Sequence, residues 1–571
     1  MKWSAVALTA MLVAAPLFAA HKRAASPPAT IVAPTTACFI PLPTTTPSCT
    51  DGATGDAAPP SFDALHPQEV TMVVNAASAA LDAGTATIAV VDRIGRPLAL
   101  FRQTHADPNN DDRAIGVART AAFFSHNMAP LTSRTVRFIS GIHFPPGVTD
   151  APNAALYGIE NTNRGCGFNV SFNAGKCIEP AKSLSGGPGP GIVTGKKQPD
   201  DSDPASVEAG GIPLYRIIPS GLDRVTSGEI HDGRLVGAIG VVGIAGDPQL
   251  NEFAAATGAF AALGSTFGPI APVPFYPLPE PGNVFIDGIR LPFLGPDLGL
   301  TFNSDGLPTG VARPAGTNAG SGAGTFVIPA GSGVCAPNEY LAGPAGGTLS
   351  STVVDGIVQR AIATAKKTRA VIRLPLNSYA RMAIAVADVD GSILAIYRMP
   401  DATIFSIDVA VAKARNVIWF SSHAAADLPG VPNGTAVTNR TINFGAQPLY
   451  PPGIDSHAFK VGPGPFYQLF LNDLANPCTQ GSQPANANQN GIVFFAGATP
   501  LYQNGTLVGG LGVSGDGIEQ DDYVTYFGAG TFLPAQSIWA DQVKIDGARL
   551  PMFKFPRHPE GVTECGGGPC S

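Results

Sequence analysis

Charged residues are scarce in this sequence: Asp, Glu, Lys and Arg make up 13% of its 571 residues. Soluble domains usually hold about 25%. The 35 basic residues form no run or stripe, and the 42 acidic residues outnumber them to give a net charge of -7. Because binding to a phosphate backbone needs a basic patch, we expect no nucleic-acid partner.

Several motifs of catalytic and metal sites are absent as well. There is no Gly-x-Ser-x-Gly, no His-Glu-x-x-His and no phosphate-binding Gly-Lys-Ser/Thr, so dedicated hydrolases and NTPases gain no support. No Cys-x-x-Cys pair occurs either. Its absence makes a metal site built on cysteines less well supported, and it excludes covalent c-type heme attachment through Cys-x-x-Cys-His.

Long apolar runs are missing beyond the N-terminus. Residues 1–20 begin with Lys2, continue with the apolar stretch Ala5 to Phe18 and end in small residues, the pattern of a secretory signal peptide. The alternative is an uncleaved anchor, but the stretch is shorter than the about 20 residues of a membrane span. We expect an exported protein, periplasmic or extracellular, with no membrane span and with a Pro/Thr/Ala-rich segment at residues 21–60.

The eight cysteines all lie beyond residue 20, and an even number in an exported chain favours disulfides. The simplest pairs are close in sequence: Cys38/Cys49, Cys166/Cys177 and Cys565/Cys570, which leaves Cys335 with Cys478. Other connectivities stay open on the sequence alone.

The sequence does contain an internal repeat. Ile88 to Arg102 matches Ile384 to Arg398 without a gap, and two later pairs of segments match in the same order. These are Leu235 to Gly243 with Leu507 to Gly515, and Ile286 to Pro292 with Ile545 to Pro551. Since the chain is also too long for one core, we expect two diverged copies at residues 61–302 and 349–559. A Gly/Ala-rich linker at residues 303–348 would join them, and a Cys/Gly tail would follow at residues 560–571.

The hydrophobic periodicity predicts the same elements in each copy. Helices are expected at residues 67–82, 112–125 and 248–263 of the first copy and at 352–368, 408–421 and 519–531 of the second. Strands are expected at 86–92 and 97–102, and at 382–388 and 392–398, with a later hairpin in each copy. This order predicts an α/β (α+β) fold: two copies of an antiparallel sheet flanked by helices, not a doubly wound nucleotide fold.

Individual residues mark the predicted turns and caps. Gly95 and Gly391 end tight turns where positive φ is needed, and the Asp232-Gly233 and Asn504-Gly505 pairs are typical of type I′ turns. Asp112 and Asp408 open their helices and are expected to cap free backbone N–H groups. Asp92 and Asp388 are expected to close hairpin turns through their side chains.

These blocks resemble the GlcG/HbpS heme-binding family, the haem-degrading domain. The second copy carries the family pattern in Arg398-Met399 with Ala402, in Lys413-Ala414, in Gly512-Val513-Ser514-Gly515 and in Gln520-Asp521. The resemblance covers about half of the chain and implies a small sheet-and-helix module with profilin-like layering, often oligomeric, which binds heme in some members. The first copy departs from it: Gln103 replaces the Met, Val117 the Lys and Val242 the Ser. If one site is degenerate, it is the first.

Some matching residues are candidates for contact with an anionic ligand. The glycines of Gly512 to Gly515 would let backbone N–H groups converge before a helix, although they would equally suit a close-packed turn. Arg102 and Arg398 end matching strands and could hold a carboxylate or propionate through a bidentate fork. They could equally pair with Asp112 and Asp408 as structural ion pairs. Lys413 is a candidate only through the resemblance.

An axial heme ligand would most simply be a histidine. His126 and His423 follow the Phe-Ser ends of the second helices at nearly equivalent positions, so they are the paired candidates for metal ligands. The alternative is a histidine favoured by the helix dipole at a C-terminus. His105, His143 and His457 are further candidates on loops.

The preferred interpretation is an exported heme-binding or small-anion-binding protein whose two copies pack as an internal pseudo-dimer, with self-association as a further expectation. It would be a noncatalytic or weakly catalytic binder of a small-molecule ligand, with heme as the cofactor. Two alternatives stay open: an enzyme acting on a small hydroxy or oxo acid, and a noncatalytic structural or assembly protein. The excursions at residues 127–210 and 424–490 are long enough to form lids, pocket walls or interfaces.

Overall fold

The computed structural model describes most of the chain beyond residue 63. The described ranges are 64–148, 151–170, 181–195, 206–218, 232–274, 284–286, 288–304, 308–334, 336–374, 377–451 and 462–560. They all belong to one compact unit. The expected signal peptide, the segment at residues 21–60, the Cys/Gly tail beyond residue 560 and the pairs Cys38/Cys49 and Cys565/Cys570 lie outside the described residues.

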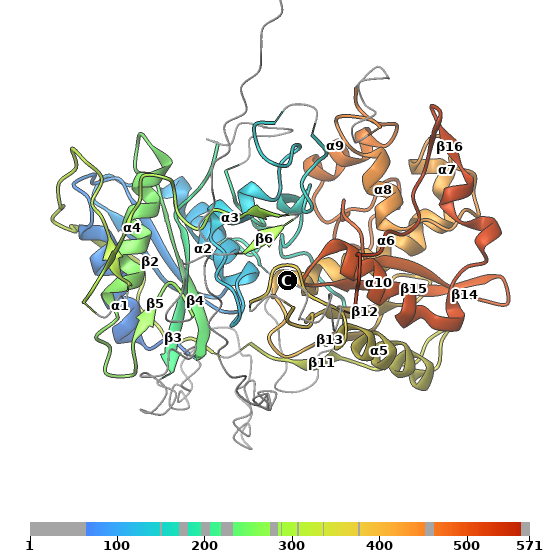
Figure 1. The fold of residues 1–571 in the computed structure, drawn as a ribbon, viewed down its shortest axis with the longest axis horizontal. Coiled ribbons are helices and arrows are strands. Elements are labelled where there is room, and N and C mark those ends of the chain that lie inside the picture. The colour runs from blue at the N-terminus through green and yellow to red at the C-terminus, as the bar shows by residue number, and fades with distance from the viewer. Residues whose placement is uncertain are drawn as a thin grey trace, which may run out of the picture. The chain divides into compact units, whose positions relative to one another are not determined.

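The first half forms a sheet in the order β10-β2-β1-β4-β3-β5, in which all pairs are antiparallel. Its strands are β1 (Thr87–Asp92), β2 (Pro97–Gln103), β3 (Gly211–Ile218), β4 (Asp232–Val242), β5 (Ile270–Ala271) and β10 (Gly324–Ile328). Its helices are α1 (Pro67–Ala79), α2 (Asp111–Phe124) and α4 (Pro248–Ala261). Helices α1 and α4 pack together against one face of the sheet, and α2 packs against the other (Figure 1).

The second half forms a sheet in the order β11-β13-β12-β15-β14, again antiparallel. Its strands are β11 (Glu339–Ala342), β12 (Ala383–Ala387), β13 (Ile393–Arg398), β14 (Ala498–Gln503) and β15 (Thr506–Ser514). Helices α5 (Ser351–Ala365) and α10 (Ile518–Ala529) pack against one face, and α6 (Phe405–Ser422) against the other. The expected α+β fold, with antiparallel sheets flanked by helices, is confirmed.

The central strands of both sheets are buried on both faces because they alternate between two apolar clusters. On β1, Ile88 and Val90 join the cluster under α1 and α4, while Ala89 and Val91 join the cluster of α2. Strand β12 alternates in the same way between α5/α10 and α6. Helices α2 and α6 share one apolar cluster, in which the rings of Phe124 and Phe405 stack with centroids 4.0 Å apart. This shared cluster makes the two halves one packed body.

Residues 303–348 are not a passive linker. They contain β9 (Pro308–Val311), which pairs with β8 (Leu300–Phe302), and they supply an edge strand to each sheet: β10 adds to the first and β11 to the second. The Gly, Ala and Thr composition suggested a linker because β10 is mostly exposed and neither β10 nor β11 shows the alternation of a half-buried strand. Their partner strands are distant in sequence, so no local pattern marks them.

One predicted turn and two predicted helix caps are wrong. Strand β4 begins at Asp232, which pairs with Ile218, so Asp232-Gly233 is not the hairpin turn. Asp112 and Asp408 do not cap their helices: Asp112 accepts a hydrogen bond from the N–H of Leu184, and Asp408 from that of Asn163. Each carboxylate therefore holds a segment of the first excursion rather than a helix end.

The turn predictions at Asn504-Gly505, Gly95, Gly391 and Asp92 are confirmed, whereas the side chain of Asp388 accepts hydrogen bonds from the N–H groups of Thr348 and Val389. Asn504 and Gly505 both have positive φ in the turn between β14 and β15, and Gly95 and Gly391 have φ of 84° and 82°. Asp92 closes its hairpin by accepting hydrogen bonds from the N–H groups of Ile94 and Arg96.

The two excursions carry short helices and are joined covalently. The first contains α3 (Ser133–Phe138), and the second contains α7 (Ala424–Asp427), α8 (Asn439–Gly445) and α9 (Tyr467–Ala475). The structure pairs Cys166 with Cys478, whose Cα atoms are 5.4 Å apart. The expected pairs Cys166/Cys177 and Cys335/Cys478 are therefore wrong, because the excursions meet in space and sequence proximity does not report that contact.

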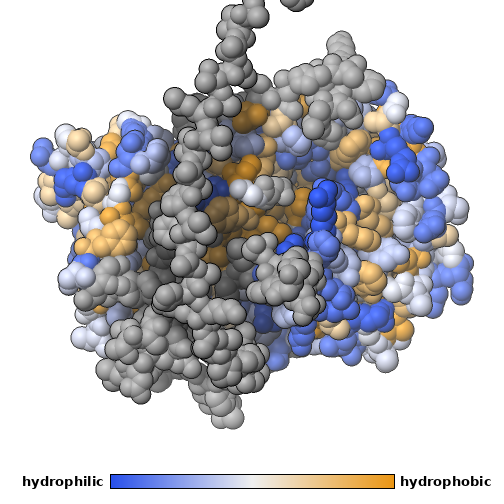
Figure 2. Space-filling model, in the orientation of Figure 1, coloured by the Kyte–Doolittle hydropathy of each residue, from blue (hydrophilic) through white to orange (hydrophobic). Residues whose placement is uncertain are grey.

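The remaining short strands form hairpins: β6 (Phe285–Ile286) with β7 (Ile289–Arg290), and β16 (Lys544–Ile545) with β17 (Ala548–Arg549). On the face shown in Figure 2, hydrophilic and hydrophobic residues are interspersed over the second half. None of the helices in the described part of the chain combines the length and the apolar character needed to cross a membrane.

Candidate functional site

Lys413 lies on α6 and is completely buried. Its Nζ donates hydrogen bonds to the carbonyl oxygen of Val513 (2.9 Å) and to Asp521 (3.0 Å), and it stands 4.8 Å from the ring centre of Phe495. Burial lowers the pKa of Lys413, while the charge of Asp521 opposes that shift. Burial raises the pKa of Asp521 to about 7. Lys413 and Asp521 therefore form a buried pair that ties α6 to the start of α10.

The segment Gly512 to Gly515 is mostly strand. Gly512, Val513 and Ser514 belong to β15 and pair with β12. A Cβ atom on Gly512 would collide with the carbonyl oxygen of Ala410, because α6 lies directly on the strand there. Ser514 donates to the hydroxyl of Ser406 on α6 (3.2 Å). The glycine therefore serves close helix–sheet packing here, which is the alternative that the sequence left open.

The two strand-end arginines have different partners. Arg102 forms a bidentate ion pair with Asp111, the residue before the expected Asp112. Arg398 is buried, and its guanidinium donates to the carbonyl oxygens of Ala402 and Pro337. Arg398 thus ties the end of β13 to the chain before β11.

His126 is buried between the halves and both of its ring nitrogens have partners. Its Nδ1 accepts a hydrogen bond from the N–H of Met128 (3.2 Å), so its Nε2 carries the proton and donates to the carbonyl oxygen of Ile372 (3.0 Å). Burial, followed by the charge of Arg373, lowers its pKa to about 4. This ring is a structural hydrogen-bonding group of the interface.

His423 lies in the opposite environment. It is the C-cap residue of α6 and is exposed. Its ring stacks on Trp419 with centroids 3.9 Å apart and planes 13° apart, and the indole N–H of Trp419 donates to Asp427 (2.8 Å). The structure therefore presents one of the two paired histidines to solvent on a fixed aromatic ring and encloses the other.

The other candidates are spread over the molecule. His105 is exposed, His143 is buried and its Nδ1 contacts the carbonyl oxygen of Ala151 (3.0 Å), and His457 lies outside the described residues. Within the described ranges, no three His, Cys, Asp or Glu side chains gather in a way that could hold a metal ion.

Residues 349–529 match the family model described as "Haem degrading protein HbpS-like". This segment is similar to that family. It contains Lys413, Asp521, Arg398, His423 and Gly512 to Gly515, and it ends with α10.

Two solved structures are also similar. One is the Klebsiella pneumoniae protein ORFY, 20% identical with a TM-score of 0.20, covering 31% of this chain and 87% of that one. The other is a PduOC:heme complex, 22% identical with a TM-score of 0.19, covering 33% of this chain and 99% of that one. No curated protein matches the sequence.

The structure also shows polar contacts that the sequence analysis missed. Thr438 and Thr441 form a capping box on α8 and donate to the carbonyl oxygens of Met552 and Pro551. In the first half, Thr132 and Thr135 do the same on α3 toward Phe293 and Pro292. A shared Thr-x-Arg-Thr pattern at residues 132–135 and 438–441 was the available signal; it lies inside the excursions, where loops were expected.

The arginine of each Thr-x-Arg-Thr pattern makes a further matching contact. Arg134 pairs with Glu252 at the start of α4, and Arg440 with Asp522 at the start of α10. Both carboxylates are buried, which raises their pKa values, and each accepts a hydrogen bond from the backbone of the segment after an Ile-Asp-Gly hairpin. Each Ile-Asp-Gly hairpin is therefore followed by a segment that is tied to a buried carboxylate.

Proposed function

We propose that this chain is an exported heme-binding protein of the HbpS type, with the ligand held by the second of two diverged copies. The HbpS-like match at residues 349–529 carries this proposal. Within that segment the sequence has only two histidines, His423 and His457, and His423 is exposed.

A tandem arrangement of copies agrees with the internal order of the sheets. The first half contains β2-β1-β4-β3 and the second contains β13-β12-β15-β14. Arg119 on α2 donates through Nε to the carbonyl oxygen of Gly95, and Arg415 on α6 donates in the same way to Gly391. Such matched contacts are expected of duplicated modules, and the apolar cluster shared by α2 and α6 supports an internal pseudo-dimer.

The residues present fit a heme that is bound at an exposed histidine. They do not fit a heme that is surrounded by all of the predicted site residues together. Bound heme supplies an iron that takes an axial nitrogen ligand. His423 would provide that nitrogen, and its stacking on Trp419 restricts the orientation of the imidazole. His126 would not provide it, because both of its ring nitrogens are engaged.

The alternative enzyme would need Arg398 and the Gly512–Gly515 segment to hold a carboxylate. The guanidinium of Arg398 donates to main-chain carbonyls instead, and Gly512 packs under α6. Lys413 is likewise engaged with Val513 and Asp521. The described contacts therefore favour binding at the surface over turnover of a hydroxy or oxo acid at these residues.

A heme titration followed in the Soret region tests the proposal. We expect a saturable spectral change that is lost in His423→Ala and retained in His105→Ala, an exposed histidine of the first half that serves as the matched control. His457→Ala is a further arm. The absence of a saturable change in the unaltered protein overturns heme binding, and loss of the change only in His457→Ala overturns the assignment to His423.

A further inference from the structure

A group of aromatic side chains lines a groove outside the predicted site residues. Tyr526 on α10 and Trp539, Phe553 and Phe555 on the following segment form its aromatic lining, and Arg549 adds a charge. Its volume is about 360 Å³, at the small end of ligand clefts, which span roughly 300–1,000 Å³. A groove of this size suits a molecule of one or two fused rings.

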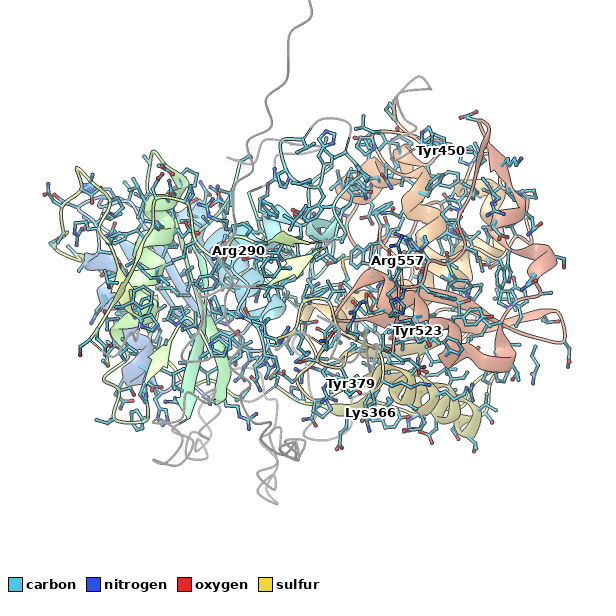
Figure 3. The ribbon with its side chains drawn as sticks, in the orientation of Figure 1. Arg290, Lys366, Tyr379, Tyr450, Tyr523 and Arg557 are labelled. Atoms are coloured by element: carbon cyan, nitrogen blue, oxygen red, sulfur yellow. A yellow bond between two sulfur atoms is a disulfide. The ribbon has the colours of Figure 1, made fainter. Side chains whose placement is uncertain are left out.

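The rings meet mostly edge to face, as favourable aromatic pairs do. Tyr526 meets Phe553 with centroids 5.4 Å apart at 84°, and Trp539 meets Phe553 at 5.5 Å and 82°. Tyr523, which is labelled in Figure 3, extends the group by contacting Phe555. Phe555 remains 40% exposed, so the groove presents aromatic surface to solvent.

The first half lacks several of these rings at its matching positions. Glu252 and Asp522 make the same contacts in their halves, which aligns α4 with α10. On this alignment Ala256 and Thr257 stand where α10 has Tyr526 and Phe527. Likewise, Leu294 and Pro296 stand where the segment after the second Ile-Asp-Gly hairpin has Phe553 and Phe555.

The equivalent face of the first half is also covered by the chain. Strand β9 contacts α4, and the guanidinium of Arg313 lies 5.3 Å from the ring centre of Phe253. In the second half, as described up to Glu560, the corresponding face carries aromatic side chains, and these line an open groove. Aromatic surface that is open to solvent points to a ligand.

The charge at the groove narrows the class of ligand. Arg549 is exposed, and its side chain has no hydrogen bond or ion pair with any described residue. Asp541, the other charged residue of the lining, accepts from Gln542 (2.9 Å). We propose that this groove binds a small planar conjugated molecule that carries a carboxylate, with the rings contacting its flat part and Arg549 pairing with its anionic group.

Calorimetric titration with three probes tests both parts of this recognition. 2-Naphthoate has the flat rings and the carboxylate, 2-naphthol lacks the carboxylate, and cyclohexanecarboxylate lacks the flat rings. We expect saturable binding of 2-naphthoate to one site, much weaker binding of 2-naphthol and none of cyclohexanecarboxylate. Arg549→Gln should weaken 2-naphthoate binding by about tenfold or more, the scale of a hydrogen bond between charged groups.

Arg290→Gln is the matched control, because Arg290 occupies the corresponding position of the first hairpin (Figure 3). It should leave 2-naphthoate binding unchanged, while Tyr526→Ala should weaken it; melting temperatures check that each variant folds. The proposal is overturned if 2-naphthoate shows no saturable binding, or if neither Arg549→Gln nor Tyr526→Ala weakens it. Heme binding at His423 is read separately in the Soret region, so either proposal can fail alone.

Discussion

At the scale of single residues, burial decides what the ionisable groups can do. His126, Asp401, Arg373 and Asp516 lie together between the halves: Arg373 bridges the two carboxylates, and the Nε2 of His126 is 3.9 Å from Asp516. Arg93 adds a second cation to Asp401. Burial makes the neutral ring of His126 part of the interface rather than an accessible ligand.

His126 should make stability depend on pH. Its pKa is about 4 in the folded protein and about 6.5 when unfolded, so the unfolded chain binds the extra proton between these values. Stability contributed by the neutral ring is complete above pH 6.5 and is lost as the pH falls toward 4, by at most about 1.4 kcal/mol per pH unit. Urea unfolding of the native protein and His126→Gln at pH 7.5, 6 and 5 measures this.

His126→Gln replaces the titratable imidazole by an amide that does not titrate. We therefore expect the stability of this variant to fall less than that of the native protein between pH 6.5 and 5. Asp408 and Asp473, whose pKa values burial raises to about 6 and about 7, act in the opposite direction but are common to both proteins. If the free energy of unfolding changed equally with pH in the two proteins, His126 would not be the source of the pH dependence.

The contrast between His126 and His423 also shows where sequence reasoning ends. The two residues follow the same Phe-Ser pattern, and the predicted helices before them are confirmed. Their accessibility depends on Ile372 and Met128 in one case and on Trp419 in the other. Ile372 is distant in sequence, so the pattern could name both histidines but could not separate them.

At the scale of helices and strands, close approach of backbones defines the module. Helix α6 lies on β15 at Gly510 and Gly512, and α2 lies on β4 at Gly240; a Cβ atom at any of these glycines would meet a helix carbonyl oxygen. The repeated Leu-Val-Gly segments marked the strands that contain these glycines. The sequence alone could not distinguish glycines needed for packing from glycines that bind a ligand. Only the position of the helix decides between them.

Gly512→Ala should therefore destabilise the second half. The backbone of α6 cannot yield as a flexible side chain would, and we expect a loss of about 1–3 kcal/mol in the free energy of unfolding, as for other overpacked cores. Gly299→Ala is the control, since a Cβ atom there meets nothing within 4 Å; its effect should stay within about 0.5 kcal/mol. Equal denaturation midpoints for the two variants would contradict this role of Gly512.

Strands that pair locally were predicted well, and strands that pair over long distances were not. The hairpins β1-β2, β12-β13 and β14-β15 are marked by alternation and by turn residues. Strands β10 and β11 add to sheets whose other strands lie far along the chain, and neither strand shows an alternation of buried and exposed residues. Asp112 and Asp408 failed as caps for the same reason, since their acceptor roles are fixed by the distant excursion.

At the scale of the whole molecule, the excursions join the halves. Tyr157 of the first stacks on Phe470 of the second with centroids 5.0 Å apart, and Cys166 of the first pairs with Cys478 of the second. A crosslink between residues so far apart in sequence closes a long loop of the unfolded chain, which lowers the entropy of the unfolded state. Together with the apolar cluster of α2 and α6, this bond would make the two halves unfold as one unit.

Cys166→Ser should lower the free energy of unfolding by about 3–5 kcal/mol, the scale expected for a bond that closes a loop of this length. Reducing agent should destabilise the native protein by a similar amount and leave Cys166→Ser unchanged. Peptide mapping without reduction should recover residues 166 and 478 in one linked fragment. A native protein whose melting is insensitive to reductant, with a free thiol at Cys166, would mean that α2, α6 and the ion pairs of Arg373 alone hold the halves together.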